Sequence, residues 1–106
     1  MAAYEPICRR LLEVYEAMLG AEHPSVAATC TNLAGLYEAQ GRYAEAEPLC
    51  QRAIQVLRSK LGSDHSDLAT ALECYATLLR KLHRNGAAAT AEKEALSIRI
   101  RCRQQP

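Results

Sequence analysis

Apolar side chains recur at steps of three and four residues through most of the chain, which is the period of an amphipathic α-helix. The clearest run lies between Pro24 and Gln40. Its apolar positions are Val26, Ala27, Cys30, Leu33, Ala34, Leu36 and Tyr37. Proline suits the first turn of a helix and glycine its end, so Pro24 and Gly41 mark the bounds of this element.

Four further stretches have the same period, and they predict helices over residues 3–19, 43–60, 66–83 and 87–103. Pro48 lies in an early turn of its helix, where a missing N–H is tolerated, and Gly62 follows the end of that helix. The last two helices are predicted to be separated by a turn at Arg84-Asn85-Gly86, because Asn-Gly is a strong turn signal. The sequence therefore predicts five helices and no strand.

The chain also repeats itself at a period of 42 residues. Glu5-Pro6-Ile7-Cys8-Arg9-Arg10 returns as Glu47-Pro48-Leu49-Cys50-Gln51-Arg52, and Leu19-Gly20-Ala21-Glu22-His23 returns as Leu61-Gly62-Ser63-Asp64-His65. Such a period indicates a repeat array, in which each unit buries its apolar face against its neighbours. We therefore expect an all-α fold, a right-handed α-solenoid of antiparallel helix pairs, that forms a single domain over residues 1–106.

The period divides this domain into the second helix of an incomplete repeat, one full repeat and a degenerate terminal repeat, over residues 3–23, 24–65 and 66–106. In the last repeat Glu92 replaces the cysteine that the earlier units carry as Cys8 and Cys50. Because an unpaired buried carboxylate is costly, we expect nothing to stack beyond this repeat. It therefore has the character of a cap.

The predicted first helix carries a broad apolar stripe, formed by Ile7, Leu11, Leu12, Val14, Tyr15, Met18 and Leu19. An exposed patch of this kind usually marks an interface. Two kinds of neighbour could cover this stripe. One is a helix that precedes the stripe in a longer protein, and the other is a second copy of the chain, which would give a homodimer through the first helix.

Several motifs resemble the tetratricopeptide repeat, whose pattern is N-L-G/A-x-x-Y, G-x-Y, A and A-L. They are Asn32-Leu33-Ala34-Gly35-Leu36-Tyr37, Gly41-Arg42-Tyr43, Ala46 and Ala53-Ile54. The usual period of that family is about 34 residues. The longer period here, with the segments 19–24, 47–49 and 61–65, is similar to the variant of kinesin light chains and nephrocystin-3-like proteins. The resemblance implies a scaffold or adaptor that binds a peptide segment of a partner protein.

In this family the first helix of each pair lines a concave groove. The resemblance therefore places Thr31, Asn32, Gly35, Glu38, Glu73, Thr77, Arg80 and Lys81 in a peptide-binding groove. The amide of Asn32 could hold a peptide backbone, because it donates and accepts hydrogen bonds at once, or it could bond a neighbouring side chain. Arg80, Lys81 and Arg84 could attract an acidic peptide, or they could be a solvated helix end favoured by the helix dipole. The competing function is a structural cap or self-associating segment with no peptide ligand.

Charge and hydropathy narrow the classes of partner. Thirteen basic and twelve acidic residues give a formal charge of +1, which is too balanced to attract nucleic acid or an anionic membrane. No stretch approaches the roughly 18 apolar residues of a membrane span, and the first residues lack the features of a signal peptide. A cytoplasmic location is therefore expected.

Candidate chemistry is sparse. The five cysteines contain no CxxC pair, and Cys8 and Cys50 recur at one repeat position, as small packing residues would. His23 and His65 precede two predicted helices, where a turn or packing role is favoured over metal ligation. No nucleophile-elbow, phosphate-loop or zinc-protease motif is present. We therefore expect no enzyme activity, no cofactor and no metal.

Overall fold

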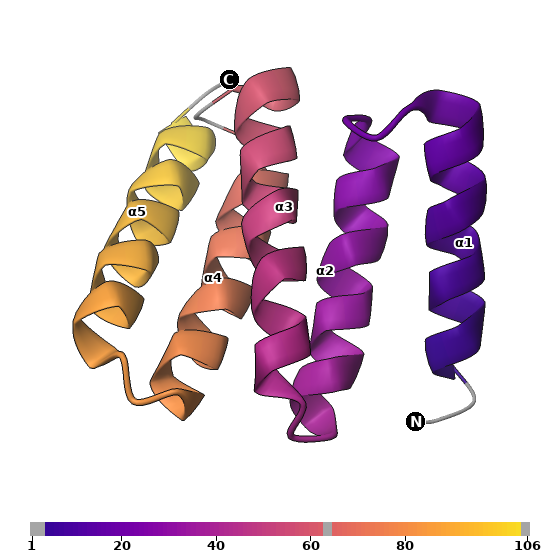
Figure 1. Ribbon diagram of the computed structural model, residues 1–106. Helices are drawn as coiled ribbons and strands as arrows, with labels where there is room; N and C mark the ends of the chain where they lie inside the picture. Colours follow the sequence, from indigo (N-terminus) through magenta and orange to yellow (C-terminus); the bar gives the residue numbers. More distant parts are fainter. Residues whose placement is uncertain (1–3, 63–64, 105–106) are drawn as a thin grey trace.

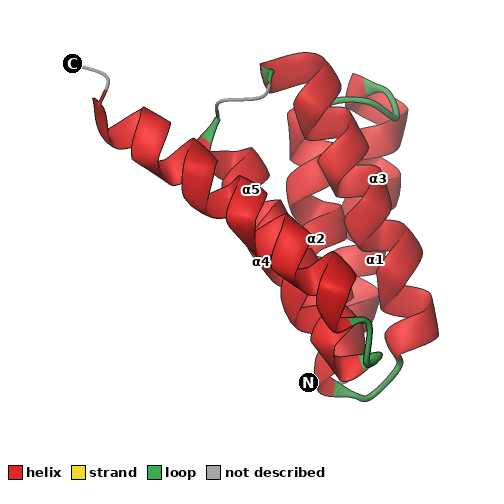
Figure 2. Cartoon of the chain, turned by 90° about the vertical axis from the view of Figure 1, so that its left-hand side faces the viewer, coloured by secondary structure: helices red, strands yellow, loops and turns green. Residues whose placement is uncertain are grey.

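The computed structural model describes residues 4–62 and 65–104, and within these ranges it contains five helices and no strand. The helices are α1 (Tyr4–Leu19), α2 (Pro24–Ala39), α3 (Tyr43–Leu61), α4 (Ser66–Lys81) and α5 (Asn85–Gln104). They follow one another antiparallel, from α1 at one edge of the molecule to α5 at the other (Figure 1). Figure 2 shows the same helices in red, with the described loops between them in green. The predicted all-α solenoid of helix pairs is confirmed.

Small side chains determine how closely the helices pack. The most extensive contacts lie within the pairs α2–α3 and α4–α5, and α3 and α4 join one pair to the next, while α1 packs on α2. The alanines at these contacts are almost completely buried: Ala27, Ala34, Ala46, Ala53, Ala76 and Ala88. Because alanine keeps the backbones close, larger side chains such as Leu33, Leu78 and Ile98 fill the spaces between helices.

Two histidines at equivalent repeat positions cap the N-terminus of the first helix of each pair. The Nδ1 atom of His23 accepts a hydrogen bond from the backbone N–H of Ser25 at 3.0 Å, and that of His65 accepts one from Asp67 at 3.1 Å. Each ring thereby satisfies one of the unpaired N–H groups of a helix N-terminus. Of the turn or packing role expected for these histidines, the structure shows the first, as N-caps of α2 and α4.

Ion pairs join the second helices across the outer surface. Arg52 of α3 donates to Glu16 of α1 at 2.8 Å, and Arg58 of α3 pairs with Glu94 of α5. The hydrogen bond that Arg52 donates to Glu16 raises the pKa of the Arg52 guanidinium. Glu16 and Arg58 are 42 residues apart, and so are Arg52 and Glu94, so the two junctions use the same repeat positions with opposite signs of charge.

The predicted turn at Arg84-Asn85-Gly86 is wrong in position, because α5 already begins at Asn85. The chain turns instead at His83, whose φ of 62° lies in the left-handed region, 42 residues after Gly41 with its φ of 77°. The hydrogen bond from Arg84 N–H to the Leu79 carbonyl matches the one from Arg42 to Tyr37, and each is 2.8 Å long. The repeated helix packing therefore overrides the local Asn-Gly signal.

Replacing His83 with glycine should stabilise the protein. The left-handed conformation is unfavourable for a residue with a Cβ, and glycine adopts it freely, so we expect about 0.5–1 kcal/mol more stability after the entropic penalty of glycine. Urea unfolding followed by circular dichroism measures the change. The reverse variant Gly41→His is the matched control and should destabilise, since no atom lies within 4 Å of the added Cβ and only the backbone conformation is at issue. Equal stabilities for His83→Gly and wild type would contradict the conclusion that His83 has an unfavourable left-handed conformation.

Replacing Ala46 with leucine should overpack the contact between α2 and α3. Ala46 is completely buried in a cluster with Leu33, Tyr37 and Cys50, so three added carbons have no space. We expect a loss of about 1–3 kcal/mol in the free energy of unfolding. Ala44→Leu, at an exposed position of the same helix, should change it by less than about 0.5 kcal/mol. A melting temperature of Ala46→Leu equal to that of wild type would rule out this packing.

Candidate functional site

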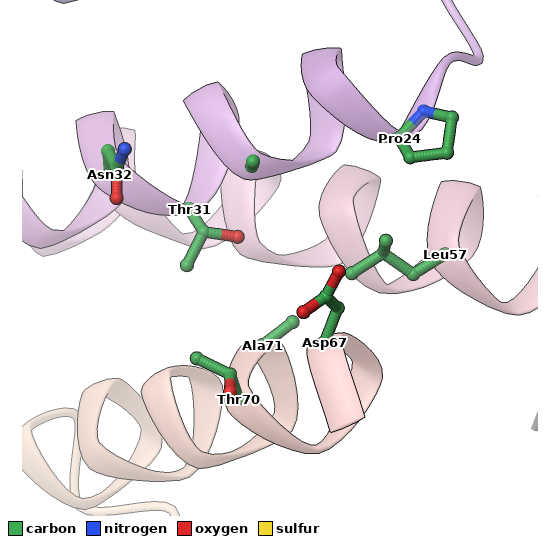
Figure 3. Close-up of a pocket in the computed structure, with 8 residues that line it drawn as sticks. Pro24, Thr31, Asn32, Leu57, Asp67, Thr70 and Ala71 are labelled. Atoms are coloured by element: carbon green, nitrogen blue, oxygen red, sulfur yellow. The ribbon is translucent and has the colours of Figure 1, made fainter. Parts of the chain in front are cut away.

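A hollow of about 170 Å³ lies between α2 and α4, the first helices of the two pairs. It is lined by Pro24, Ala28, Thr31, Asn32, Leu57, Asp67, Thr70 and Ala71 (Figure 3). The α2 residues follow helical spacing, and so do Asp67, Thr70 and Ala71 of α4, so each helix contributes one face. Leu57 of α3 belongs to the buried core at the base of the hollow.

Asn32 is the polar group of the hollow with unused hydrogen-bonding capacity. It is exposed, and its amide makes no hydrogen bond to another residue in the described part of the chain. The alternative that Asn32 bonds a neighbouring side chain is therefore not seen. By contrast, the hydroxyl of Thr31 donates to the Ala27 carbonyl at 3.0 Å, and that of Thr70 donates to the Ser66 carbonyl at 3.2 Å.

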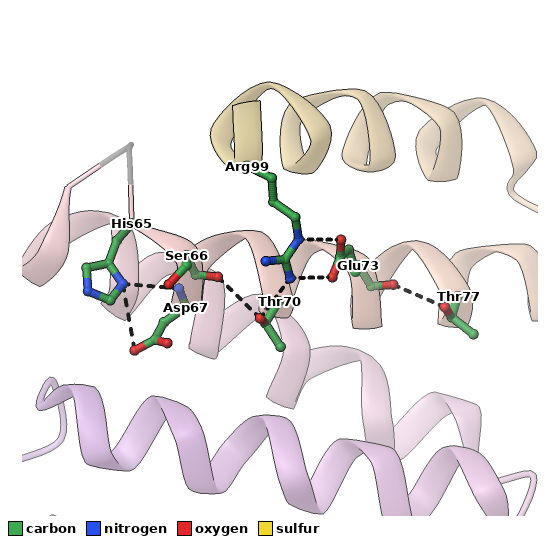
Figure 4. Close-up of polar contacts among 7 residues, drawn as sticks. All are labelled: His65, Ser66, Asp67, Thr70, Glu73, Thr77 and Arg99. Carbon is green, nitrogen blue, oxygen red and sulfur yellow. Dashed lines mark hydrogen bonds and ion pairs between the residues drawn. The ribbon is translucent and has the colours of Figure 1, made fainter. Parts of the chain in front are cut away.

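Asp67 gives the hollow its charge. Its carboxylate is largely exposed, and its Oδ2 atom lies 3.7 Å from Nδ1 of His65 (Figure 4). Sequence reasoning missed Asp67 as a lining residue. Its spacing, one helical turn before Thr70 and Ala71, is the signal that would have placed it there.

Two of the expected groove residues face a different neighbour. Glu73 and Thr77 line a separate hollow with Glu92, Leu96 and Arg99 of α5. Arg99 donates two hydrogen bonds to the Glu73 carboxylate, at 2.8 Å and 2.7 Å, and a third to Thr70 at 3.1 Å (Figure 4). The hydrogen bond from Arg99 holds the pKa of Glu73 below its ordinary value. These two residues therefore belong to the contact between α4 and α5.

The remaining expected residues lie beyond the hollow. Gly35 is exposed and Glu38 is half-buried on α2, further along the helix than Asn32. Arg80 forms an ion pair with Glu92 of α5, whereas exposed Lys81 has no partner among the described residues.

Arg84, the third member of the predicted basic cluster, also has an acidic partner. Its guanidinium donates two hydrogen bonds to the Glu47 carboxylate, at 2.7 Å and 2.8 Å, which raises the pKa of Arg84. Since Arg80 and Arg84 are both paired, Lys81 is the member of the cluster whose charge is left for a ligand.

A larger hollow, of about 650 Å³, lies between α1 and α3. Leu33 and Tyr37 of α2 line it, and the guanidinium groups of Arg42 and Arg9 lie 4.4 Å and 5.3 Å from the centre of the Tyr37 ring. Arginine over an aromatic face is favourable at these distances. Both signs of charge are present here, because Glu13 and Glu45 line the same hollow, so it shows no preference for a ligand charge.

The cysteines are packing residues in this structure. Cys30 and Cys50 are buried, and burial raises the pKa of both thiols, that of Cys50 to about 12. Burial also raises the pKa of the half-buried Cys74. A thiol with a raised pKa is a poor nucleophile near neutral pH, because the thiolate is the reactive form.

The described residues offer neither a cluster of metal ligands nor a membrane-spanning helix. They contain no group of three histidine, cysteine or acidic side chains placed to hold a metal ion. Their helices also lack the combination of length and apolar character that crossing a bilayer requires.

The sequence of the chain matches the model of a known protein family. A search of the curated proteins gave no relative of this chain. The family model described as tetratricopeptide repeat matches residues 27–101, which include all of α3 and α4 and most of α2 and α5. Members of this family generally mediate protein–protein interactions. Since the match covers more than half of the chain and falls on two consecutive antiparallel helix pairs, the chain belongs to the tetratricopeptide repeat family.

Proposed function

We propose that the chain is a scaffold or adaptor module that binds an extended peptide segment of a partner protein in the hollow between α2 and α4. The observation that carries this proposal is the unused amide of Asn32 at a hollow lined by α2, α3 and α4. An extended peptide offers N–H and C=O groups in alternation, and one amide side chain can pair with both. Ala28 and Ala71 add little bulk, which leaves room for a peptide backbone.

The charge of the ligand is a separate part of the proposal. The acidic peptide expected from the basic cluster remains a prediction, and Lys81 is the residue that supports it. Within the hollow itself Asp67 is the charged lining residue, so we expect the ligand to place a neutral or basic group there.

A structural cap is the second candidate function. The ion pairs between α4 and α5 favour it. Arg99 pairs with Glu73 and Arg80 pairs with Glu92, so charged groups occupy the positions around Leu96. A further apolar helix would have to remove these ion pairs from water, which is unfavourable. We propose that residues 66–106 act as the terminal repeat of the single domain, with 3–23 and 24–65 as the units before it.

Finer predictions of the sequence also belong to this proposal. We propose that the repeats are of the 42-residue variant found in kinesin light chains and nephrocystin-3-like proteins, and that the protein is cytoplasmic. Its ligand is a protein or peptide rather than nucleic acid or a membrane, and it acts without catalysis, cofactor or metal.

Truncating Asn32 should weaken partner binding. Loss of hydrogen bonds to a peptide backbone costs about 1–3 kcal/mol, so Asn32→Ala should bind about 5- to 150-fold more weakly. The measurement is quantitative mass spectrometry of proteins that immobilised wild-type and variant chains capture from cell extract. Gln55→Ala removes an exposed amide from α3, outside the hollow, and should capture the wild-type set.

A second variant, Lys81→Glu, tests whether the ligand is acidic, independently of whether it binds in the hollow. If the ligand is acidic, this variant should lose partners, and the loss should shrink as salt rises. Partner sets that are the same for wild type, Asn32→Ala and Lys81→Glu would reject the hollow as the binding surface and favour the cap.

A further inference from the structure

The surface that α2 and α4 share continues beyond the hollow toward the ends of the two helices. On α2, exposed Gly35 follows Asn32 by about one turn, and half-buried Glu38 follows Gly35 by another. No other helix comes within 4 Å of the position that a Cβ would take at Gly35, so the surface is open between Asn32 and Glu38. On α4, half-buried Cys74 lies about two turns after Asp67. We call this surface, defined by these five residues, the α2–α4 face.

Two carboxylates of the α2–α4 face have no arginine or lysine partner among the described residues. The side chain of Glu38 makes neither a hydrogen bond nor an ion pair there. Asp67 has the imidazole of His65 at 3.7 Å, which is charged only when it is protonated. Burial, and after it the negative charge of Glu38, raises the pKa of the Cys74 thiol, so Glu38 acts across the space between α2 and α4. Both helices therefore give the face negative charge.

The cations of this region do not balance the two carboxylates. Arg99 reaches Thr70 at the edge of the hollow, but two hydrogen bonds hold its guanidinium on Glu73. Lys81, in the last turn of α4, keeps its charge and forms no ion pair with Glu38. Two unpaired carboxylates against one unpaired ammonium group leave the α2–α4 face with an excess of negative charge.

The distance between the two carboxylates suits an extended peptide. Cys74, on which Glu38 acts, lies about 10 Å along α4 from Asp67. The α2 residue that corresponds to Asp67 is Ser25, and Glu38 lies about 20 Å further along α2. An extended chain advances about 3.3 Å per residue, so side chains about three to six residues apart span this interval. The long stems of lysine and arginine can carry a charge to a half-buried carboxylate such as Glu38.

We propose that the peptide segment bound between α2 and α4 is basic, with one lysine or arginine beside Asp67 and a second beside Glu38. This inference deepens the proposed function and rests on it. Asn32 lies between the two carboxylates and pairs with the peptide backbone, while the carboxylates select the side chains. The ligand thus has the charge opposite to the one expected from the basic cluster of Arg80, Lys81 and Arg84.

Binding of synthetic peptide pools to the immobilised chain tests this charge. The pools contain blocked, otherwise uncharged peptides of random sequence, in which two lysines, two glutamates or two glutamines are placed about three to six residues apart. Wild type should retain the lysine pool at least about fivefold more than the glutamine pool at low salt, and the difference should shrink as salt rises. The glutamate pool should be retained least.

Variants that remove or reverse the two charges locate the preference. Asp67→Asn combined with Glu38→Gln keeps the size of both side chains and should lower retention of the lysine pool to that of the glutamine pool. Asp67→Lys combined with Glu38→Lys should favour the glutamate pool instead. Glu13→Gln is the matched control, because Glu13 is an exposed carboxylate of α1 that lines the larger hollow, and it should bind as wild type does. Circular dichroism shows whether each variant keeps its helices.

The outcomes separate this inference from the proposed function. A preference for the glutamate pool, or equal retention of all three pools, overturns the basic ligand, and the proposed function stands if Asn32→Ala lowers that retention. A preference for the lysine pool that Asp67→Asn with Glu38→Gln leaves unchanged, or that Glu13→Gln removes, belongs to another surface and overturns the inference as well. Retention of no pool, or retention that Asn32→Ala does not alter, counts against the proposed function itself.

Discussion

The structure depends on the requirement that each helix bury more than one face. In the middle of the chain this requirement is met twice, because α3 packs on α2 within its pair and on α4 of the next pair. Alanines allow the helices to approach closely at both contacts. Because Ala46 and Ala53 are completely buried, they fix the distance between neighbouring helices. The hollow between α2 and α4 follows from this arrangement, since consecutive first helices are held apart by the second helix that packs on both.

The helices at the two ends of the stack, α1 and α5, have a neighbouring helix on fewer faces, and their outward faces differ in composition. On α5, Glu92 and Arg99 occupy the repeat positions of Cys50 and Leu57 in α3. Both form ion pairs with α4, so these positions do not need a further helix to pack on them. Exposed pairs of this kind contribute little stability, but they make the surface polar. On α1 the free positions are aliphatic. The α5 end is therefore more polar than the α1 end, although Leu96 and Ile100 are also exposed on it.

Much of the fold could be predicted from the sequence, because the apolar period and the 42-residue repeat report directly on packing. The site was harder to predict. Thr31 and Asn32 line the hollow between α2 and α4, because helical spacing alone decides their face, and their part in peptide binding stays a prediction. The pairing of Glu73 with Arg99 could not be predicted, because Arg99 lies 26 residues further along the chain and belongs to a different helix. The turn before α5 was missed for the same reason, since the packing of α4 and α5, and not the local Asn-Gly pair, fixes His83 in its left-handed conformation.

The reversed ion pairs at the two outer junctions bear on how the repeats find their correct order during folding. Near-identical repeats can exchange places, because their apolar faces are alike. Glu16 with Arg52 and Arg58 with Glu94 give each junction its own direction of charge. If α1 packed beside α5 in place of α3, Glu16 would meet Glu94, and two copies of α3 placed side by side would bring Arg52 to Arg58. Like charges at these positions disfavour both errors, so two surface ion pairs of little value to stability discriminate against misordered repeats.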